Sequence, residues 1–408
     1  MVGCFYGFAL FHAHCRYVTS LNIKTLLYGV LIITSEERRE VRYQRRAQKR
    51  KEKRRRHIEG YDNYENVISF NAILNGYKKS RRGVGWKGSV QRYGVNLFRN
   101  ALNTCTRLEQ CKPVTKGFSE FILMERGKAR HIKSVHISER CIQRSLCDNA
   151  LVPVLSRSLI YDNGASIKGK GIHFSLNRVN AHLRRYYRKH GNDGYVLVMD
   201  FKSYFENIRH EPIYDELDAR FEDKRIVNLA KQFVGAFGDK SLGLGSQVSQ
   251  ILAVHYTNKI DHFIKEQLGI KYYGRYMDDC YLIHHDKGYL RECLSAIREK
   301  CKERGLVLNG KKTQLIKLSR GFTFLKTRLY LTDTGKVVNR PSKDSIVRMR
   351  RKLKKFKKML DAGEMEFRDI YTSYMSWRGY IKHKDAYRTI KAMDGLFSDL
   401  FIRQRAID

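Results

Sequence analysis

The segment GRYMDDCYLIHH, residues Gly274–His285, sets two adjacent aspartates into a stretch that otherwise favours a buried β-strand. Burying an unpaired carboxylate is costly, so Asp278 and Asp279 need a cation or access to water. Neighbouring residues of one strand point to opposite faces of a sheet. A tight turn at Met277 and Asp278 would instead pair the residues before and after it as antiparallel strands. Both carboxylates would then lie at the tip of one hairpin.

A third carboxylate follows another run of β-forming residues, GYVLVMD, which ends at Asp200. If the two strand ends meet, three carboxylates form a hard, all-oxygen site that suits Mg²⁺. Two such ions about 4 Å apart would activate a hydroxyl nucleophile and stabilise a leaving pyrophosphate. An isolated Asp-Asp pair is most often a turn or a helix cap. The β-forming residues on both sides, together with the strand that ends at Asp200, favour the metal site.

The charge balance restricts the partners of this chain. Its 408 residues suffice for two or three domains, and an apolar content of 42% is typical of a globular protein. Lys and Arg total 80 against 41 Asp and Glu, a formal net charge of +39. This excess indicates a polyanionic partner, with nucleic acid as the first candidate. A membrane surface is the alternative, but the positive charge is spread along the whole chain rather than gathered beside an apolar span.

The first sixty residues read as an extension. Residues 1–34 are mildly apolar, and their longest apolar run, Leu26–Ile33, is too short to span a bilayer. No small-residue cleavage site follows it, so we do not expect a signal peptide. Residues Ser35–His57 are almost entirely charged. They predict a solvated helix or arm, a contact with an RNA backbone, or both together. The nine cysteines contain no CxxC pair, which indicates reduced thiols and a cytoplasmic location.

The last seventy residues predict three basic helices. In the first, Met349, Leu353, Phe356 and Leu360 recur at helical spacing. Asp344 is the candidate N-cap of this helix and Gly363 its terminating glycine. Further apolar stripes continue the pattern: Phe367, Ile370, Tyr371 and Tyr374, then Tyr387, Ile390, Leu396, Phe397 and Leu400. The stripes predict a core, and the cationic faces are candidates for contact with nucleic acid.

Several motifs resemble those of reverse transcriptases, the RNA-directed DNA polymerases. YMDD at Tyr276–Asp279 resembles their central motif, VLVMDFKSYFENIRH their first palm motif, and GLGLGSQVSQ their second. LVLNGKKTQLIKLSRGFTFL resembles the stretch that follows, with its primer-contacting hairpin. Upstream, ARHIKSVHISERCIQRSL and NGASIKGKGIHFSLNRV resemble fingers segments, and the C-terminal residues resemble a bacterial thumb. The resemblance runs in family order from about Lys116 to Phe397.

The resemblance implies an α+β fold with the architecture of a right-hand polymerase. Its divisions would be an N-terminal extension with a basic arm at 1–60, fingers at 61–193, a palm at 194–335 and a helical thumb with a C-terminal tail at 336–408. The palm would be an antiparallel sheet backed by helices, some of them inserted within it, and the thumb would contain three helices.

The resemblance also implies residue roles. Asp200, Asp278 and Asp279 would bind two Mg²⁺ ions, for which Mn²⁺ can substitute, and Lys312 would act as a general acid toward pyrophosphate. The dNTP-binding candidates are Arg130, Phe205, Leu244, Gly245, Ser249, Gln250, Tyr276 and Met277. The candidates for contact with primer and template are Phe324, Leu325, Lys354 and Lys358. Taken alone, Phe205 is as compatible with an ordinary core aromatic, Lys312 with a solvated lysine and Arg130 with a hairpin surface.

Two positions depart from the family pattern. Leu244 stands where retroviral and group II intron enzymes have a glutamine, and this part of the sequence resembles the motif of diversity-generating retroelements. An apolar residue there accompanies error-prone copying of adenines, so low fidelity is a hypothesis. Lys326 replaces the glycine that usually follows Phe-Leu in the primer-contacting hairpin.

The expected partners are an RNA template, a DNA or RNA primer, dNTPs, a structured noncoding RNA from the same locus and a small basic accessory protein, with no membrane. Three settings fit this reading: a diversity-generating or unassigned prokaryotic retroelement, an antiphage defence system, or a domesticated intron enzyme. A maturase-like RNA-binding protein with dispensable catalysis is the alternative from another class. Untemplated or protein-primed synthesis is a third possibility.

Overall fold

The computed structural model describes residues 34–125 and 127–402, so the extension expected at residues 1–34 lies outside the described residues except for Thr34. The chain divides into two compact units, residues 1–57 and 58–408. Helix α2 (Ser35–Glu59) accounts for the described part of the first unit, and its residues are almost all exposed. The prediction of a solvated helix over Ser35–His57 is therefore confirmed.

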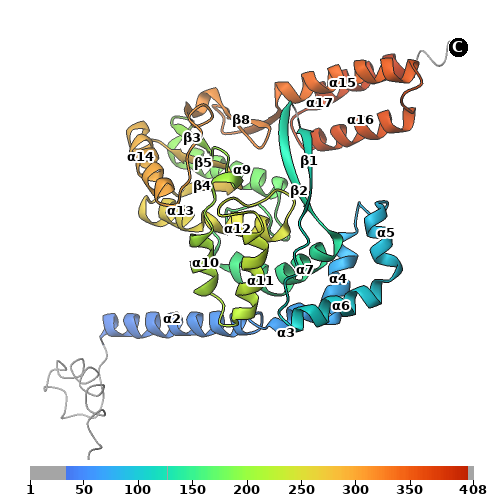
Figure 1. The fold of residues 1–408 in the computed structure, drawn as a ribbon. Helices are drawn as coiled ribbons and strands as arrows, with labels where there is room; N and C mark the ends of the chain where they lie inside the picture. The colour runs from blue at the N-terminus through green and yellow to red at the C-terminus, as the bar shows by residue number, and fades with distance from the viewer. Residues whose placement is uncertain (1–33, 126, 403–408) are drawn as a thin grey trace, which may run out of the picture. The chain divides into compact units, whose positions relative to one another are not determined.

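The N-terminal part of the second unit is a group of helices joined to a β-hairpin (Figure 1). Its elements are α3 (Tyr64–Ile68), α4 (Phe70–Ser80), α5 (Gly88–Val95), α6 (Leu97–Glu109), β1 (Phe118–Glu125), β2 (Lys128–Val135), α7 (Ile137–Leu146), η2 (Cys147–Leu151), α8 (Val152–Leu155) and η3 (Ser156–Ser158). The two strands pair antiparallel from Phe118 opposite Val135 to Glu125 opposite Lys128. The two strands therefore form one β-hairpin.

A four-stranded antiparallel sheet, which we call the palm sheet, follows in the order β4-β5-β3-β6. Its strands are β3 (Tyr195–Asp200), β4 (Tyr272–Tyr276), β5 (Asp279–His284) and β6 (Gln314–Lys317). Leu197 and Met199 pack into one core cluster, whereas the alternate residue Val196 packs into a second. Both faces of the sheet are thus covered, which explains why its strands read as continuous apolar runs.

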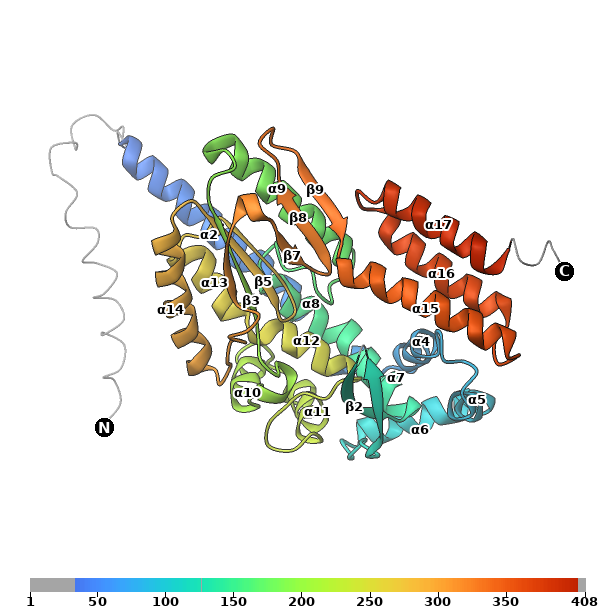
Figure 2. The same ribbon diagram turned by 90° about the horizontal axis from the view of Figure 1, so that it is seen from above.

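Helices cover both faces of the palm sheet. They are α9 (Ile172–His190), α10 (Glu211–Asp218), α11 (Lys224–Gly235), α12 (Gln247–Tyr256), α13 (Asn258–His262) and α14 (Lys287–Glu303), with the short turns η4 (Phe205–Asn207), η5 (Phe263–Gln267) and η6 (Leu318–Arg320). Helix α14 contributes Leu290 and Ile297 to the first cluster, and α9 contributes Val179 and Leu183 to the second. Figure 2 shows α9 alongside the strands and α14 at the other side. The expected antiparallel sheet backed by helices is confirmed, and with it the α+β class.

A three-stranded sheet connects the palm sheet to the C-terminal helices. It contains β7 (Phe322–Phe324), β8 (Thr327–Leu331) and β9 (Val337–Pro341), paired antiparallel in that order. Leu325 and Lys326, the two residues between β7 and β8, both have positive φ, at 47° and 59°. A two-residue turn of this type favours glycine or asparagine. The hairpin forms with Lys326 in place of glycine, but the backbone of the lysine is more strained at this positive φ than that of a glycine would be.

Three C-terminal helices, α15 (Lys343–Asp361), α16 (Phe367–Lys382) and α17 (Tyr387–Phe401), form the thumb helices and share one core. Met349, Leu353 and Phe356 are buried there, as their spacing predicts. Gly363 follows the end of α15 with φ +72°, as expected for a terminating glycine.

Three details of the predicted thumb are wrong. Ser342, rather than Asp344, is the N-cap of α15, and Asp344 lies in its first turn. Tyr371 belongs to the predicted stripe of α16 but is 48% exposed, because Ile370, Tyr374 and Ile381 supply the buried face of that helix. Tyr387 is 78% exposed and lies outside the core, because Met393, Phe397 and Phe401 supply the buried face of α17.

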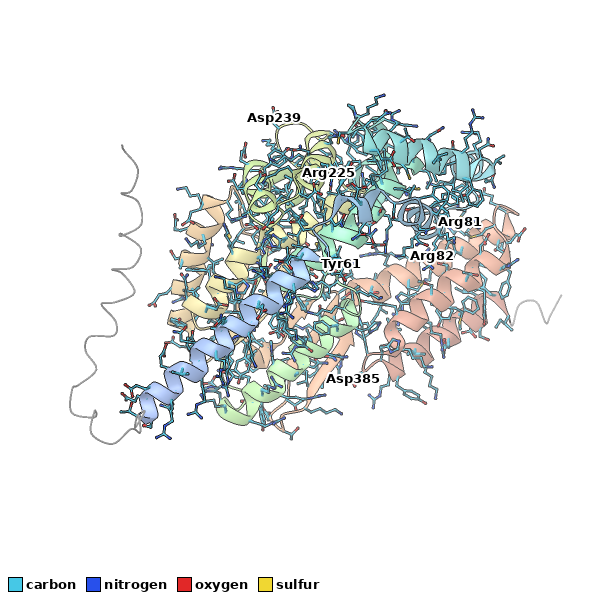
Figure 3. All side chains as sticks on the ribbon, turned by 90° about the horizontal axis from the view of Figure 1, so that it is seen from below. Tyr61, Arg81, Arg82, Arg225, Asp239 and Asp385 are labelled. Atoms are coloured by element: carbon cyan, nitrogen blue, oxygen red, sulfur yellow. The ribbon has the colours of Figure 1, made fainter. Side chains whose placement is uncertain are left out.

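Two hydrogen bonds join the connection between α16 and α17 to β9. The backbone N–H of Asp385 donates to Asn339 O at 2.8 Å, and the Asp385 carboxylate accepts from Asn339 N at 2.8 Å (Figure 3). In the described ranges no helix is long and apolar enough to cross a membrane. The seven cysteines described in the structure are all free thiols.

Candidate active site

The pairing of β3 with β5 brings two of the predicted aspartates together. Asp200 is the last residue of β3 and lies directly opposite Asp279, the first residue of β5. Directly opposed residues share a face of the sheet, with Cβ atoms about 5 Å apart. Asp278 is in the turn immediately before Asp279. Three carboxylates from two distant segments therefore converge at one end of the palm sheet, as the sequence predicts.

A two-residue turn, Met277 and Asp278, joins β4 to β5, since Tyr276 pairs with Asp279. Met277 has φ +53°, a conformation that costs free energy in a residue with a Cβ. The buried guanidinium of Arg275 donates to Met277 O at 3.1 Å and holds this turn.

Arg275 is itself held by a buried carboxylate from α13. Its Nε and Nη2 bind Asp261 at 2.8 Å and 2.7 Å, and Nη2 also donates to Val254 O at 2.8 Å. Arg275 is 1% exposed and Asp261 is fully buried. This buried pair was missed by sequence reasoning, because nothing in the sequence pairs a helical aspartate with an arginine fourteen residues later.

Lys312 reaches the first aspartate. Its ammonium group lies 2.7 Å from each carboxylate oxygen of Asp200. The turn that carries it is anchored to the same strand, because Asn309 N donates to Asp200 O at 2.7 Å and Thr313 N donates to Asn309 O at 2.8 Å. The Asn-x-x-Lys-Thr element therefore positions a cation beside the carboxylates.

Burial and mutual repulsion alter the ionisation of these groups. Burial first, then the Asp200 carboxylate, raises the pKa of Asp278. Burial, followed by the charges of Asp278 and Asp200, raises the pKa of Asp279 to about 7. Burial lowers the pKa of Lys312, but its hydrogen bond to Asp200 and the attraction of all three carboxylates outweigh this, so the net shift is upward.

The donor set at this end of the sheet fits a hard divalent cation. Among residues 34–125 and 127–402 no three His, Cys, Asp or Glu side chains are arranged as a metal-binding cluster, and Lys312 supplies the positive charge beside Asp200. The three groups are nevertheless all carboxylates, and a divalent cation would favour their charged forms against the burial that is the largest cause of the raised pKa values of Asp278 and Asp279.

A cleft of about 880 Å³ opens at the three carboxylates. On the palm side it is lined by Asp200, Tyr276, Met277, Asp278, Asp279, Lys312, Leu325 and Lys326, among others. The thumb helices contribute Arg348, Lys352, Trp377 and Tyr380. Tyr380 also donates to Leu325 O at 3.3 Å.

The thumb lysines predicted to contact primer and template do not line this cleft. Lys354 and Lys358 are exposed on other faces of α15, whereas Arg348 and Lys352, one turn apart, face the cleft. Phe324 is 2% exposed and belongs to the core beneath the β7–β8 turn, so of the two hairpin residues predicted to contact the primer, Leu325 lines the cleft and Phe324 does not. Sequence periodicity identified the buried stripe of α15 but not which of its cationic faces meets the palm.

The predicted dNTP-binding residues of the second palm motif lie outside the lining of the cleft. Ser249 is 1% exposed, and its N–H donates to Ser246 Oγ at 3.2 Å as part of the N-cap of α12. Gly245 has φ +109° and packs close to Lys133 O of β2, where an added Cβ would lie at 3.4 Å. Leu244 is partly buried and Gln250 is exposed.

The two remaining dNTP-binding candidates are Arg130, which lies near the carboxylates, and Phe205, which lies against the core. The exposed Arg130 on β2 is close enough for its positive charge to lower the pKa of Asp278, against the larger upward effect of burial. Phe205 is partly buried and packs against the first core cluster. The core interpretation of Phe205 therefore holds, which leaves its predicted contact with a sugar untested.

Comparison with curated proteins gives no match. Solved structures that match include a telomerase from Candida albicans in complex with the TWJ fragment of telomeric RNA, with a TM-score of 0.42, 11% identity, and coverage of 56% of this chain and 46% of that one.

Two structures of apo telomerase from Candida tropicalis also match. One, truncated from its C-terminal domain, has a TM-score of 0.43 and 13% identity, with 54% of each chain covered. The other has a TM-score of 0.44 and 14% identity, with 71% of this chain and 60% of that one covered. The chain thus spans between 46% and 60% of the length of these telomerases.

The sequence profile of one protein family matches this chain. The profile described as reverse transcriptase (RNA-dependent DNA polymerase) matches residues 117–329, which is more than half of the 408 residues. The matched range includes all three aspartates and Lys312. The chain therefore belongs to the reverse transcriptase family, whose members are RNA-directed DNA polymerases and hence nucleotidyltransferases.

Proposed function

We propose that this protein adds deoxynucleotides to a primer 3′-hydroxyl on an RNA template. The observation that carries the proposal is the position of Asp200 directly opposite Asp279, with Asp278 in the adjoining turn and the Lys312 ammonium 2.7 Å from Asp200. A protein that only binds RNA has no need for three converging carboxylates, because their charge opposes a polyanion.

Asp200, Asp278 and Asp279 would hold two Mg²⁺ ions, or Mn²⁺ in their place, which would activate the primer hydroxyl and neutralise the triphosphate. Lys312 is protonated at neutral pH, as an ordinary lysine is, and the nearby carboxylates raise its pKa further. It can therefore supply positive charge or a proton to the leaving pyrophosphate. Arg130 would bind the triphosphate through its planar guanidinium. Phe205 would lie under the sugar and disfavour a 2′-hydroxyl.

The primer–template duplex would occupy the cleft between the palm sheet and the thumb helices. We infer that Arg348 and Lys352 contact its backbone in place of Lys354 and Lys358, since the former line the cleft. Trp377 and Tyr380 offer aromatic surfaces beside these cations. Tyr276, Met277 and Leu325 would contact the substrate from the palm side.

The test is incorporation of labelled dNTPs on a primed RNA with Mg²⁺ and with EDTA. Asp278→Ala with Asp279→Ala is expected to abolish incorporation, whereas Asp239→Ala removes an exposed acid and is the matched control (Figure 3). Undiminished incorporation by the double variant would exclude the carboxylate site. RNA binding without incorporation by the unaltered protein would favour a maturase-like role. Incorporation without template would indicate untemplated or protein-primed synthesis.

The finer assignments concern fidelity and setting. Leu244 motivates low fidelity, and sequencing the product of a defined RNA template would test it; an error rate unchanged by Leu244→Gln would count against it. The same motif supports a prokaryotic or prophage retroelement, with antiphage defence and a domesticated intron enzyme as the other settings. A template repeat, a structured noncoding RNA or a gene for a small basic accessory protein in the flanking DNA would distinguish them. The cytoplasmic location stays a prediction.

A further inference from the structure

Two adjoining cavities form a groove on the N-terminal helices, separate from the catalytic cleft. Their volumes are about 670 and 710 Å³, and Ser89, Lys116 and His136 line both. One wall is formed by α5 and α6, and the other by the base of the β1–β2 hairpin and the first turn of α7 (Figure 1). The groove shares no lining residue with the cleft at the three aspartates.

The charges that line this groove are all positive. They come from Lys87, Arg92, Arg107, Lys116 and Arg140, and neither cavity is lined by an aspartate or a glutamate. The nearby Glu139 is only 2% exposed, and its carboxylate accepts the backbone N–H of Lys116 at 2.6 Å. A concave surface with cations of one sign concentrates anions, because its walls focus the electric field.

Polar groups lie beside these cations in the first cavity. Asn100, Asn103 and Ser138 line it together with Tyr93. Ser138 is in the first turn of α7, where the N-terminus of a ten-residue helix adds partial positive charge. These groups favour a ligand with oxygen acceptors.

Aromatic rings lie at the other end of the groove. Phe118 and Phe121 line the second cavity, and Phe121 is 47% exposed. Trp86 is 74% exposed, with the Lys87 ammonium 5.6 Å from its ring centroid. Cations that track a phosphate backbone, combined with rings on which bases stack, are the features of single-strand nucleic-acid sites.

We propose that this groove binds a single-stranded RNA segment outside the primer–template cleft. The identity of the ligand as RNA rests on the proposed function; the groove itself rests on its charge and its rings. Phosphates would lie along Arg92, Arg107 and Lys116, and bases would stack toward Phe121.

The test is a fluorescence-anisotropy titration of the full chain with a labelled single-stranded oligouridylate, without metal or dNTP, over a series of KCl concentrations. Arg92→Ala with Lys116→Ala removes two exposed groove cations. For single strands each lost phosphate contact reduces the salt slope by about 0.7, so the slope is expected to fall by about 1.4. Lys78→Ala with Arg82→Ala, which removes two exposed cations outside the groove, is expected to leave the affinity nearly unchanged.

Phe121→Ala is the second variant, because it removes an exposed ring that lines the groove and leaves the core intact. A loss of about five- to 150-fold in affinity is expected from one stacked base. Equal effects of the groove pair and the control pair, together with unchanged binding by Phe121→Ala, would overturn the proposal, since diffuse charge would then explain binding. Asp278→Ala with Asp279→Ala is expected to bind the oligouridylate normally, so a failure of the polymerase assignment does not affect this result.

Discussion

Replacing Arg275 by methionine is expected to lower the free energy of unfolding by about 3–5 kcal/mol, because it removes one partner of a buried ion pair and leaves the other charged. Arg275 is 1% exposed and Asp261 is fully buried, with the shortest contact at 2.7 Å. Burial lowers the pKa of Arg275, but the Asp261 charge outweighs it and holds the guanidinium protonated. The loss is comparable to a large part of the stability of an ordinary domain, about 5–15 kcal/mol.

The assay is urea denaturation monitored by tryptophan fluorescence and by circular dichroism. The matched control is Lys300→Met, which breaks an exposed pair with Glu303 whose side chains are 41% and 60% exposed. Such surface pairs contribute about 0–1 kcal/mol. The double variant Arg275→Met with Asp261→Leu is expected to be more stable than Arg275→Met alone, since it leaves no unpaired buried charge.

A loss below about 1 kcal/mol for Arg275→Met, or strict additivity of the two single changes, would refute the reasoning. Arg275→Lys distinguishes the role of the charge from that of the guanidinium geometry. The lysine ammonium retains the positive charge, but it lacks the second nitrogen that donates to Met277 O. We expect it to recover part of the stability and less of the dNTP incorporation, since the turn that carries Asp278 loses its hydrogen bond.

Three other predictions concern the carboxylates and one close contact. The pKa of Asp279 is raised to about 7 in the folded protein, so its protonated side chain contributes stability that is complete below about pH 4 and is lost as pH rises through 7. In EDTA, the free energy of unfolding of Asp279→Asn is therefore expected to exceed that of the wild type by up to about 4 kcal/mol at pH 8 and to equal it at pH 4. Equal free energies of unfolding at pH 8 would contradict this. Lys312→Ala is expected to reduce the incorporation rate by about 10²-fold, while the exposed neighbour Lys311→Ala leaves it unchanged; similar losses in both would count against the general-acid role. Gly274→Ala is expected to lower the free energy of unfolding by about 1–3 kcal/mol, because the added Cβ would lie 2.6 Å from Tyr281 Oη. The control Gly395→Ala, which has open space around it in helix α17, is expected to raise the free energy of unfolding by about 0.5–1 kcal/mol. A stabilised Gly274→Ala would show that the Tyr281 side chain moves away from the added Cβ.

Local pattern was enough to predict several elements. The hairpin that carries Asp278 and Asp279 and the strand that ends at Asp200 both follow from runs of β-forming residues, with a turn at Met277 and Asp278. The three apolar stripes of the thumb also predict its helices, although Tyr371 and Tyr387 are exposed rather than part of the shared core. Such elements depend on the backbone preferences and burial of residues close in sequence, and these are visible in the order of side chains.

Contacts between distant segments required the fold. The pairing of Lys312 with Asp200 spans 112 residues, and the Arg275–Asp261 pair joins a strand to a helix. The same holds for α15, where the rotation of the helix, set by Leu353 and Phe356 against the other thumb helices, turns Arg348 and Lys352 toward the palm. The sequence by itself determined which residues carry charge and which strands form. Only the tertiary structure decided which charges meet, because the distance between two side chains depends on how whole elements pack.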